Sequence, residues 1–288
     1  MKQIVVISGK GGTGKTTLTA AISTIAKNKV IADCDVDAPD LHLILNPKVK
    51  KTMVFHGLKL AVIDNKKCIR CMRCYKSCRF DAINEDLDIS KDKCEGCGVC
   101  EYVCPVNAVS MADRDTGYLY MAETRLGPFS YGILKTAEEA SGKLVSAVRE
   151  NAKDIAEEKG LDTIIIDGPP GIGCPVIASI TGVDLALIVV EPTKSGIHDM
   201  ERVLKVTRHF NVRAVVCINK YDISPEYTTR IEEYCKNEGV EIVGKIPFDE
   251  DIVRAMVEGK SIIEFNRDSD TSKRISGMWN KIKDMMGE

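Results

Sequence analysis

Eight of the twelve cysteines in this chain of 288 residues fall between positions 68 and 104, and they follow one spacing twice. In each copy, two residues separate the first three cysteines and three residues precede the fourth. The two copies are Cys68, Cys71, Cys74 and Cys78, then Cys94, Cys97, Cys100 and Cys104. The same offset relates Lys67 to Lys93 and Ala82 to Ala108. This duplication constrains the segment to fold so that matched thiols converge.

The spacing is that of bacterial ferredoxins with two [4Fe–4S] clusters. A run of three closely spaced cysteines supplies three thiolates to one cluster, and the fourth thiolate comes from the other repeat. We therefore predict that one cluster is bound by Cys68, Cys71, Cys74 and Cys104. The second cluster is predicted to be bound by Cys94, Cys97, Cys100 and Cys78.

A disulfide framework and structural zinc are the alternatives for these cysteines. Disulfides are disfavoured, because the chain shows no signal peptide and its cysteine usage is typical of a reducing cytosol. Two zinc sites would not require fourth cysteines exchanged between the repeats. One position departs from the ferredoxin pattern, since Arg79 follows Cys78 where Pro105 follows Cys104. The intact spacing still predicts that Cys78 binds a cluster.

The first cysteine repeat is strongly basic. Its cations are Lys66, Lys67, Arg70, Arg73, Lys76 and Arg79. One interpretation is a docking surface for an acidic redox partner, or a field that raises the potential of the nearer cluster. The other is a solvated face offset by the acidic residues that follow, Asp81, Glu85, Asp86 and Asp88. Both interpretations remain open from the sequence.

A second motif lies near the N-terminus. Residues 3–7 are apolar enough for a buried strand, a glycine-rich loop covers residues 9–16, and a helix is expected from Thr16. Strand, loop and helix in this order are the context of a phosphate-binding loop. Lys15 is expected to reach the β- and γ-phosphates of ATP, and the Thr16 hydroxyl to bind Mg²⁺. The residues expected to contact the nucleotide are Gly11, Gly12, Thr13, Gly14, Lys15, Thr16 and Thr17.

The loop also carries Lys10, a second lysine ahead of the glycines. In this feature the chain resembles the deviant Walker A ATPases, which include MinD, ParA, the Mrp-type iron–sulfur carriers and the nitrogenase iron protein. The resemblance implies that Lys10 reaches across an ATP-dependent homodimer to the partner's phosphates. The similarity runs through about residues 1–55 and 115–288.

The resemblance also assigns roles to carboxylates that follow two strands. It implies that Asp35 orients the attacking water, whereas Asp33 and Asp37 are structural. Asp40 lies close by in the sequence, so proximity to Mg²⁺ is a rival role for any of these four acids. Asp167, after the apolar run 163–166, is expected to hold Mg²⁺ through water.

Three further positions follow from the same resemblance. The Gly171 amide is expected near the γ-phosphate, in a second switch that begins with two prolines. Asn219 is expected to bond the edge of the adenine, and Pro247 to lie in the loop covering its other side. Cys174 follows the second switch, and a metal or redox role for it across a dimer interface is the less favoured interpretation.

The order of the apolar segments predicts the fold. After the first strand, loop and helix, strands are expected at 163–167, 185–191, 213–219 and 241–246, and a helical stretch at 135–158. Strands alternating with helices predict an α/β fold with a doubly wound, mostly parallel sheet. Residues 1–57 and 113–288 are assigned to this P-loop ATPase domain. Residues 58–112 are assigned to an inserted, small α+β ferredoxin-like domain.

Composition narrows the function further. The formal net charge of −2 argues against general affinity for nucleic acid, and no apolar run approaches the ~20 residues of a membrane span. The C-terminal segment has a helical stripe formed by Ile275, Met278, Trp279, Ile282 and Met286. A membrane-targeting helix and a helix packed on the sheet are the two interpretations, and we favour packing. A cytoplasmic location is expected.

These observations predict an Mg²⁺-dependent ATPase whose nucleotide state is coupled to two [4Fe–4S] clusters, gating electron transfer to a partner protein. The first alternative is an ATPase that assembles or carries iron–sulfur or other metal clusters for a client. The second alternative is a MinD/ParA-like positioning ATPase with a redox sensor. The predicted cofactors are ATP, Mg²⁺ and the two clusters. The predicted partners are a second copy of the chain and a redox or metallocluster client.

Overall fold

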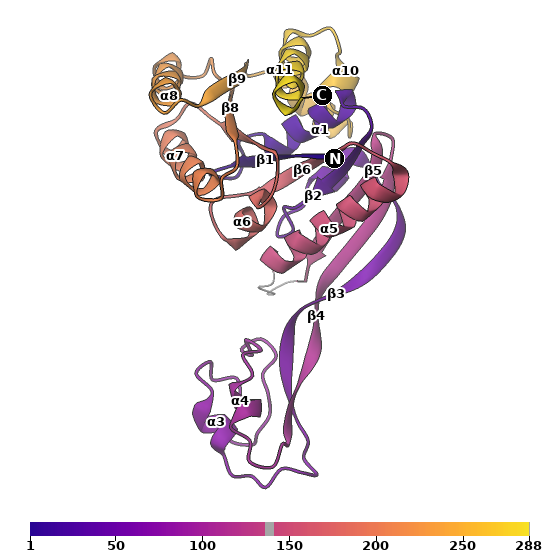
Figure 1. Cartoon of the computed structure of the whole chain (residues 1–288), viewed down its shortest axis with the longest axis vertical. Helices are drawn as coiled ribbons and strands as arrows, with labels where there is room; N and C mark the ends of the chain where they lie inside the picture. Colours follow the sequence, from indigo (N-terminus) through magenta and orange to yellow (C-terminus); the bar gives the residue numbers. More distant parts are fainter. Residues whose placement is uncertain (136–140, 288) are drawn as a thin grey trace. The chain divides into compact units, whose positions relative to one another are not determined.

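A computed structural model describes residues 1–135 and 141–287 of the chain (Figure 1). The chain divides into two compact units. The first unit comprises Met1–Thr52, Leu119–Ile133 and Ser141–Glu288, and the second comprises Met53–Tyr118 and Leu134–Ala140. The second unit contains the predicted insert, 58–112, and extends beyond it at both ends. The added residues 53–57 and 113–118 belong to two long strands that the sequence did not predict.

The described residues form a sheet of nine strands in the order β3-β4-β5-β2-β6-β1-β7-β8-β9. The strands are β1 (Lys2–Ser8), β2 (Lys29–Asp33), β3 (Lys48–Ile63), β4 (Val109–Thr124), β5 (Gly127–Leu134), β6 (Thr163–Pro170), β7 (Leu185–Val190), β8 (Ala214–Asn219) and β9 (Glu241–Ile246). Neighbours from β5 to β9 in this order pair in parallel. The predicted mostly parallel α/β sheet is confirmed.

Continuous apolar runs explain the centre of the sheet. β7 is buried at every position, and β6 is buried from Thr163 to Pro169. Strands covered on both faces lack the alternation of polar and apolar residues that a half-exposed strand shows. β5 shows the two faces directly, because Phe129 and Tyr131 pack with α2 residues whereas Ser130 donates a hydrogen bond to the Val148 carbonyl of α5.

The helices of the described residues are α1 (Lys15–Ile25), α2 (Leu41–Leu45), α3 (Arg73–Ser77), α4 (Val99–Tyr102), α5 (Ser141–Lys159), α6 (Cys174–Ile180), α7 (Lys194–His209), α8 (Pro225–Asn237), α9 (Glu250–Val257), α10 (Ile262–Phe265) and α11 (Asp270–Met286). The helical stretch predicted over 135–158 corresponds to α5. Lys135 is not helical, and residues 136–140 lie outside the described residues.

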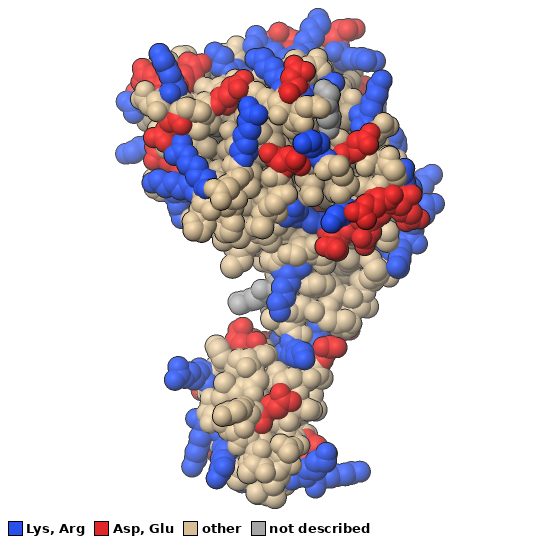
Figure 2. Space-filling view, in the orientation of Figure 1, with Lys and Arg blue, Asp and Glu red and all other residues tan. Residues whose placement is uncertain are grey.

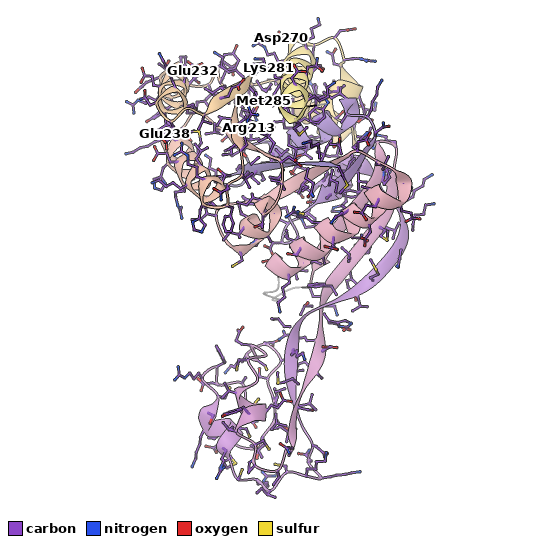
Figure 3. The ribbon with its side chains drawn as sticks, in the orientation of Figure 1. Arg213, Glu232, Glu238, Asp270, Lys281 and Met285 are labelled. Carbon is purple, nitrogen blue, oxygen red and sulfur yellow. The ribbon has the colours of Figure 1, made fainter. Side chains whose placement is uncertain are left out.

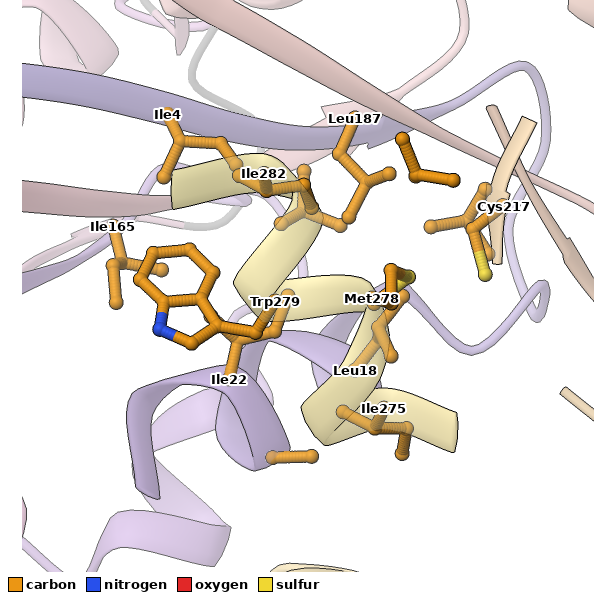
Figure 4. Close-up of a cluster of buried hydrophobic side chains, with 14 of the residues drawn as sticks. Ile4, Leu18, Ile22, Ile165, Leu187, Cys217, Ile275, Met278, Trp279 and Ile282 are labelled. Carbon is orange, nitrogen blue, oxygen red and sulfur yellow. The ribbon is translucent and has the colours of Figure 1, made fainter. Parts of the chain in front are cut away.

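The C-terminal stripe packs in the core of the first unit. Ile275, Met278, Trp279, Ile282 and Met286 are all buried, in a cluster with side chains of β1 and α1 (Figure 4). The opposite side of α11 carries exposed residues such as Lys281 (Figure 3). Packing, rather than membrane targeting, is therefore confirmed for this helix. Within the described residues, no helix has the length and apolarity that crossing a membrane requires.

β3, β4 and β5 are the strands that the sequence did not predict. β3 is exposed or half-buried at every position except Gly57 and Ala61, so it lacks the apolar run by which the other strands were recognised. β4 continues into β5 through only Arg125 and Leu126, a connection that makes an antiparallel hairpin. At this edge of the sheet the hairpin strands β4 and β5 are antiparallel, whereas the centre of the sheet is parallel.

The second unit has its own small core around the cysteines. Its fully buried members are Ala61, Cys74, Ile83, Leu87 and Val109. Two short helices, α3 and α4, each begin one residue before the third cysteine of a repeat and contain it. An isolated antiparallel bridge joins Ile83 to Ile89. So few apolar residues provide little burial, which is consistent with a unit that depends on bound groups for stability.

Candidate functional site

The glycine-rich loop joins β1 to α1 and takes a conformation that requires glycine. Gly12 and Gly14 have φ values of 78° and 89°, in the left-handed region that glycine tolerates. A Cβ atom on Gly14 would stand 2.4 Å from Nδ2 of Asn219. Loop and β8 therefore approach each other closely, and the amides at the start of α1 point into the space in front of the helix.

That space is a cavity of about 610 Å³ in the first unit. Three groups of residues line it: the phosphate-binding loop, the acidic segment after β2, and the segments that follow β6, β8 and β9. The predicted residues among them are Gly11, Gly12, Gly14, Lys15, Thr16, Thr17, Asp35, Asn219 and Pro247. The cavity is within the usual size range of sites for small organic ligands. The structure thus brings most predicted nucleotide contacts together.

Asp167 lies within β6, behind Thr16 of the phosphate-binding loop, and is not among the residues that line the cavity. It is buried, and its two oxygens accept hydrogen bonds from the hydroxyls of Thr16, at 2.7 Å, and Thr19, at 2.9 Å. Burial raises the pKa of Asp167, while Lys15 and the two threonines oppose the rise. A carboxylate bonded to the Thr16 hydroxyl is the pair expected at a Mg²⁺ site that also holds nucleotide phosphates.

Asp33 and Asp35 have different surroundings despite their proximity. Asp33 is fully buried, accepts hydrogen bonds from the amides of Asp35 and Leu41, and does not line the cavity. Burial and the neighbouring Asp167 raise its pKa well above the usual range. These contacts fit the structural role expected of Asp33, which fixes the segment after β2.

Asp35 lines the cavity and is only partly buried. Burial raises the pKa of Asp35 to about 6, against the opposing effect of Lys15. Asp37 and Asp40 line the same cavity and are more exposed. A carboxylate that lines the cavity together with Lys15 is placed to bond a water molecule there.

Lys10 does not line the cavity among the residues described. Its Nζ atom lies 3.5 Å from a carboxylate oxygen of Glu191, near the hydroxyls of Thr193 and Ser195 at 3.4 and 3.5 Å. Glu191 also binds Nζ of Lys220 at 2.5 Å. Lys10 and Lys15 therefore differ in position, since only Lys15 faces the cavity of its own chain.

Two predicted contacts differ from expectation. The Gly171 amide donates a hydrogen bond to the Ser8 carbonyl at 2.9 Å, and Gly171 is not among the lining residues, so in this structure the amide does not face the cavity. Asn219 lines the cavity, but its Nδ2 donates to the Thr13 carbonyl at 2.8 Å and its Oδ1 accepts from the Lys220 amide. The Gly171 amide and the Asn219 side chain, both predicted to contact the nucleotide, thus form hydrogen bonds with backbone groups of the protein.

Thr13 also departs from its predicted position. Its side chain is buried, its hydroxyl has no hydrogen-bond partner among the described residues, and it does not line the cavity. The Thr13 carbonyl, in contrast, accepts the Asn219 bond that ties the loop to β8. Thr13 contributes to the site through its backbone.

An apolar wall completes the cavity, and the sequence reasoning did not identify it. It is formed by Phe248, Ile252, Val253, Met256 and Ile275. Asp249 caps α9 by accepting the Asp251 amide, which orients this wall. The sequence did contain a signal for this wall, because apolar residues at 252, 253 and 256 have the spacing of one apolar face of a helix. Such a wall suits the flat faces of an aromatic base.

The second unit places the cysteines in the two predicted quartets. One cavity is lined by Cys68, Cys71, Cys74 and Cys104. A second cavity is lined by Cys78, Cys94, Cys97 and Cys100. The fourth cysteine of each repeat thus lies with the first three of the other. Among the described residues, no group of three or more His, Cys, Asp or Glu side chains is arranged to hold a metal ion.

The backbone of the two repeats matches as well. Left-handed φ values occur at pairs of positions with the same offset as the cysteines, Arg70 with Gly96 and Met72 with Gly98. Amide groups also point at sulfur, since the Arg70 amide donates to Cys68 Sγ at 3.4 Å and the Ala108 amide donates to Cys104 Sγ at 3.2 Å. Amide–sulfur bonds of this kind stabilise thiolates that bind iron.

The remaining cysteines divide into buried and exposed. Cys34, Cys217 and Cys235 are buried, which confirms that Cys217 and Cys235 belong to the core. Burial raises the pKa of Cys217 to about 12 and that of Cys235 to about 11, so both remain protonated thiols. Cys174 is exposed at the start of α6.

Known proteins resemble this chain along most of its length. An uncharacterized protein of Methanocaldococcus jannaschii is 36% identical over 288 residues, which cover 99% of this chain and 97% of that protein. The septum site-determining protein MinD of Neisseria meningitidis is 26% identical over 286 residues, which cover 91% of this chain and 84% of that protein.

Solved structures share the fold. MinD of Pyrococcus horikoshii, in complex with Mg-ADP, aligns with a TM-score of 0.63 at 17% identity, covering 99% of this chain and 97% of that one. MinD in the MinC:MinD complex of Aquifex aeolicus aligns with a TM-score of 0.59 at 22% identity, covering 100% and 97%. The pattern of the CobQ/CobB/MinD/ParA nucleotide binding domain matches residues 4–262. With its phosphate-binding loop, carboxylates and parallel sheet in one site, the chain belongs to this family of P-loop nucleotide-binding proteins.

Proposed function

We propose that the chain is a MinD/ParA-like ATPase that binds and hydrolyses Mg·ATP in the 610 Å³ cavity. The observation that carries this proposal is the placement of Lys15, Thr16 and Asp167, with the Thr16 hydroxyl 2.7 Å from the Asp167 carboxylate. Lys15 binds the terminal phosphates, and Thr16 and Asp167 orient the metal. Asp35, which also lines the cavity, orients the attacking water. The adenine base packs against the apolar wall that includes α9 residues.

Two chains form the active dimer in this proposal. Lys10 does not face its own cavity among the described residues, and an ion pair with Glu191 holds its side chain away from it. When the ion pair between Lys10 and Glu191 breaks, Lys10 can contact the phosphates of the nucleotide bound to the second chain. The MinC:MinD complex of Aquifex aeolicus shows a relative bound to a protein partner, and we extend protein binding to this chain.

The second unit binds two [4Fe–4S] clusters in our proposal. The support is the sorting of eight cysteines into two cavities, each with three thiols from one repeat and one from the other. A cubane cluster presents four separate iron atoms, so its thiolates need not converge on a single point as the ligands of one ion do. When bound, such clusters supply one-electron redox chemistry. The cysteines hold them and the amides of Arg70 and Ala108 bond their sulfur ligands.

Among the roles open to such a protein, a positioning ATPase with a redox sensor has the broadest support. The similarity to septum site-determining proteins extends over 91% of the chain. Electron transfer gated by ATP rests on the cysteine cavities alone and is the second candidate. Both roles share an ATP switch and two clusters, and they differ in whether electrons leave the protein during turnover.

Anaerobic purification followed by iron, sulfide and ATPase assays tests this function. The intact chain is expected to carry about eight irons, because each cluster has four. Cys97→Ser should lose one cluster while ATP turnover persists, whereas Cys174→Ser should keep all iron as the matched control. Eight irons retained in Cys97→Ser would contradict the two-cluster assignment. Stoichiometric electron transfer to an acceptor on each ATP cycle would favour the second candidate.

A further inference from the structure

A groove of about 530 Å³ on the second unit opens beside one of the predicted cluster ligands. Its walls include Arg73 and Lys76 from α3, Tyr102 from α4, and Cys104 with Pro105. Cys104 and Arg73 also line the first cysteine cavity, so the groove and that cavity share two residues. An electron that enters the first cluster from this groove would therefore travel through the sulfur of Cys104, a predicted ligand of that cluster.

The positive charge of the groove is not balanced by neighbouring acids. Arg73 and Lys76 are exposed one turn apart on α3, and within the described residues neither side chain forms an ion pair or hydrogen bond. No acidic residue lines the groove. Asp86 and Asp88 instead line a different cavity with Arg70, beside Cys68. Asp86 and Asp88 thus share a cavity with Arg70 and not with Arg73 or Lys76.

An aromatic side chain faces the cations. Tyr102 is 92% exposed, the highest value among the large apolar and aromatic residues of the chain. Tyrosine gives a large, rigid contact area and a polar tip, which favours it at protein interfaces. Figure 2 shows basic side chains projecting from the unit that contains α3 and α4. A groove with cations and an exposed aromatic ring is complementary in charge to a protein surface that carries carboxylates.

We propose that this groove is the docking site of an acidic protein that carries single electrons, and that the first cluster is the point of electron entry. The proposal rests on the cluster function given above. The reduced carrier loses one electron and the oxidised cluster gains it, without a bond or proton changing place. Arg73 and Lys76 attract the acidic carrier and favour the more negative, reduced state of the nearby cluster.

The test measures cluster reduction by an acidic probe, the plant-type [2Fe–2S] ferredoxin, using the anaerobic full-length protein. Arg73→Gln with Lys76→Gln removes the groove cations. Lys66→Gln with Arg79→Gln is the matched control, because it removes two exposed cations from the same repeat outside the groove. In stopped-flow bleaching at low salt, the groove variant should react about tenfold more slowly and lose its salt dependence. The control should stay within about twofold.

A viologen dye controls for changes in the cluster itself, since it needs no docking and should reduce all three proteins at similar rates. Equal slowing of both double variants by ferredoxin would overturn the groove as the docking site. Slowing of the groove variant by the dye as well would also overturn it, because the cluster rather than docking would be altered. Tyr102→Ser tests the other wall and should weaken docking without changing the charge.

Binding of labelled ferredoxin, measured by fluorescence anisotropy, separates docking from the cluster proposal. Affinity should fall about tenfold in the groove variant alone, whether or not iron is bound. If the protein carries no iron, the cluster function and the electron step both fail, and anisotropy still decides whether the groove binds acidic protein. Equal affinity for wild type and groove variant overturns the docking proposal even when eight irons are present.

Discussion

At the scale of single residues, Lys15 is the counter-charge of the nucleotide cavity. Its side chain is nearly buried, and it lowers the pKa values that burial raises at Asp35 and Asp167. A cation in this position offsets the desolvated carboxylates and is ready to bind phosphate. Lys10 has a different partner, Glu191, at the edge of the site. The two lysines of one loop should therefore respond differently to substitution.

Lys15→Ala should weaken ATP binding by about 10- to 100-fold, the usual effect of losing hydrogen bonds to a charged group. Lys10→Ala should bind ATP normally but lose turnover and ATP-dependent dimerisation, because in the proposed dimer Lys10 acts on the partner's nucleotide. Calorimetry measures the first effect, and light scattering with Mg·ATP measures the second. A Lys10→Ala protein that dimerises and hydrolyses like wild type contradicts the action in trans.

Asp35→Asn should reduce ATP hydrolysis while binding persists, since water orientation contributes to the transition state and not to ground-state binding. Thr16 and Asp167 keep the metal site intact. Turnover and ATP affinity are measured on the same preparation. A parallel loss of both would make Asp35 a metal ligand or a structural residue instead.

The stability of the nucleotide-free protein should depend on Asp35 and pH. Burial raises its pKa from 3.8 to about 6, so the folded state binds the proton more tightly than the unfolded chain does. The ionised carboxylate therefore costs stability above pH 6, and the cost disappears as the pH falls toward 4. Asp35→Asn should be more stable than wild type at pH 7 by about 1 kcal/mol, after allowance for solvent screening. Urea unfolding at several pH values should show the difference vanish near pH 4.

At the scale of elements, α11 closes the apolar face that β1 and α1 leave open. Trp279 and Ile282 are buried in that cluster, whereas Lys281, between them, is exposed. Gly244 on β9 allows the close approach, because a Cβ atom there would stand 2.8 Å from the sulfur of Met278. The helix is thus fixed by its fit to the sheet.

Trp279→Ala should lower the free energy of unfolding by about 3–5 kcal/mol, because it leaves a cavity among side chains that cannot fully collapse. Lys281→Ala, on the exposed side of the same helix, should change it by no more than about 0.5 kcal/mol. Chemical denaturation of both variants provides the comparison. Equal stability of wild type and Trp279→Ala would mean that α11 is detached from the core in solution.

At the scale of the whole molecule, one chain connects an ATP site and a predicted redox unit through β3 and β4. The acidic segment after β2 precedes β3 by few residues, as α2 is the only helix between them. If ATP shifts the potential of a cluster, reduction must shift ATP affinity by the same free energy. A coupling of ~1.4 kcal/mol is a tenfold change in ATP affinity, or about 60 mV for a one-electron cluster.

ATP affinity of the anaerobic protein should therefore differ between the oxidised and the dithionite-reduced states. A tenfold difference is the expected size, and the potentials with and without ATP should agree with it by linkage. Lys15→Ala, which is expected to bind ATP more weakly, is the control: at an ATP concentration too low to saturate this variant, its cluster potentials should not shift. Equal affinities together with unchanged potentials would leave the two units energetically independent and remove the basis for both redox sensing and redox gating.

Short-range features of the sequence determined much of this structure. The phosphate-binding loop was predictable because its glycines, lysine and threonines act within one strand–loop–helix unit. Most of the parallel strands were predictable because they are continuous apolar runs, whereas β5 was not predicted. α11 was predictable because its apolar residues follow the helical period. The cysteine quartets followed from a repeated spacing, which limits how the thiols can meet.

Contacts between distant segments were decided only by the tertiary structure. β3 carries no apolar run, so its place beside β4 depends on pairing that local sequence does not encode. The Gly171 amide and the Asn219 side chain took backbone partners, Ser8 and Thr13, that lie far away in the sequence. The apolar wall of α9 and the free cations of α3 likewise became visible only when folding set their neighbours. The local sequence specifies the side chains and the secondary structure of each segment, and tertiary packing determines which groups those side chains contact.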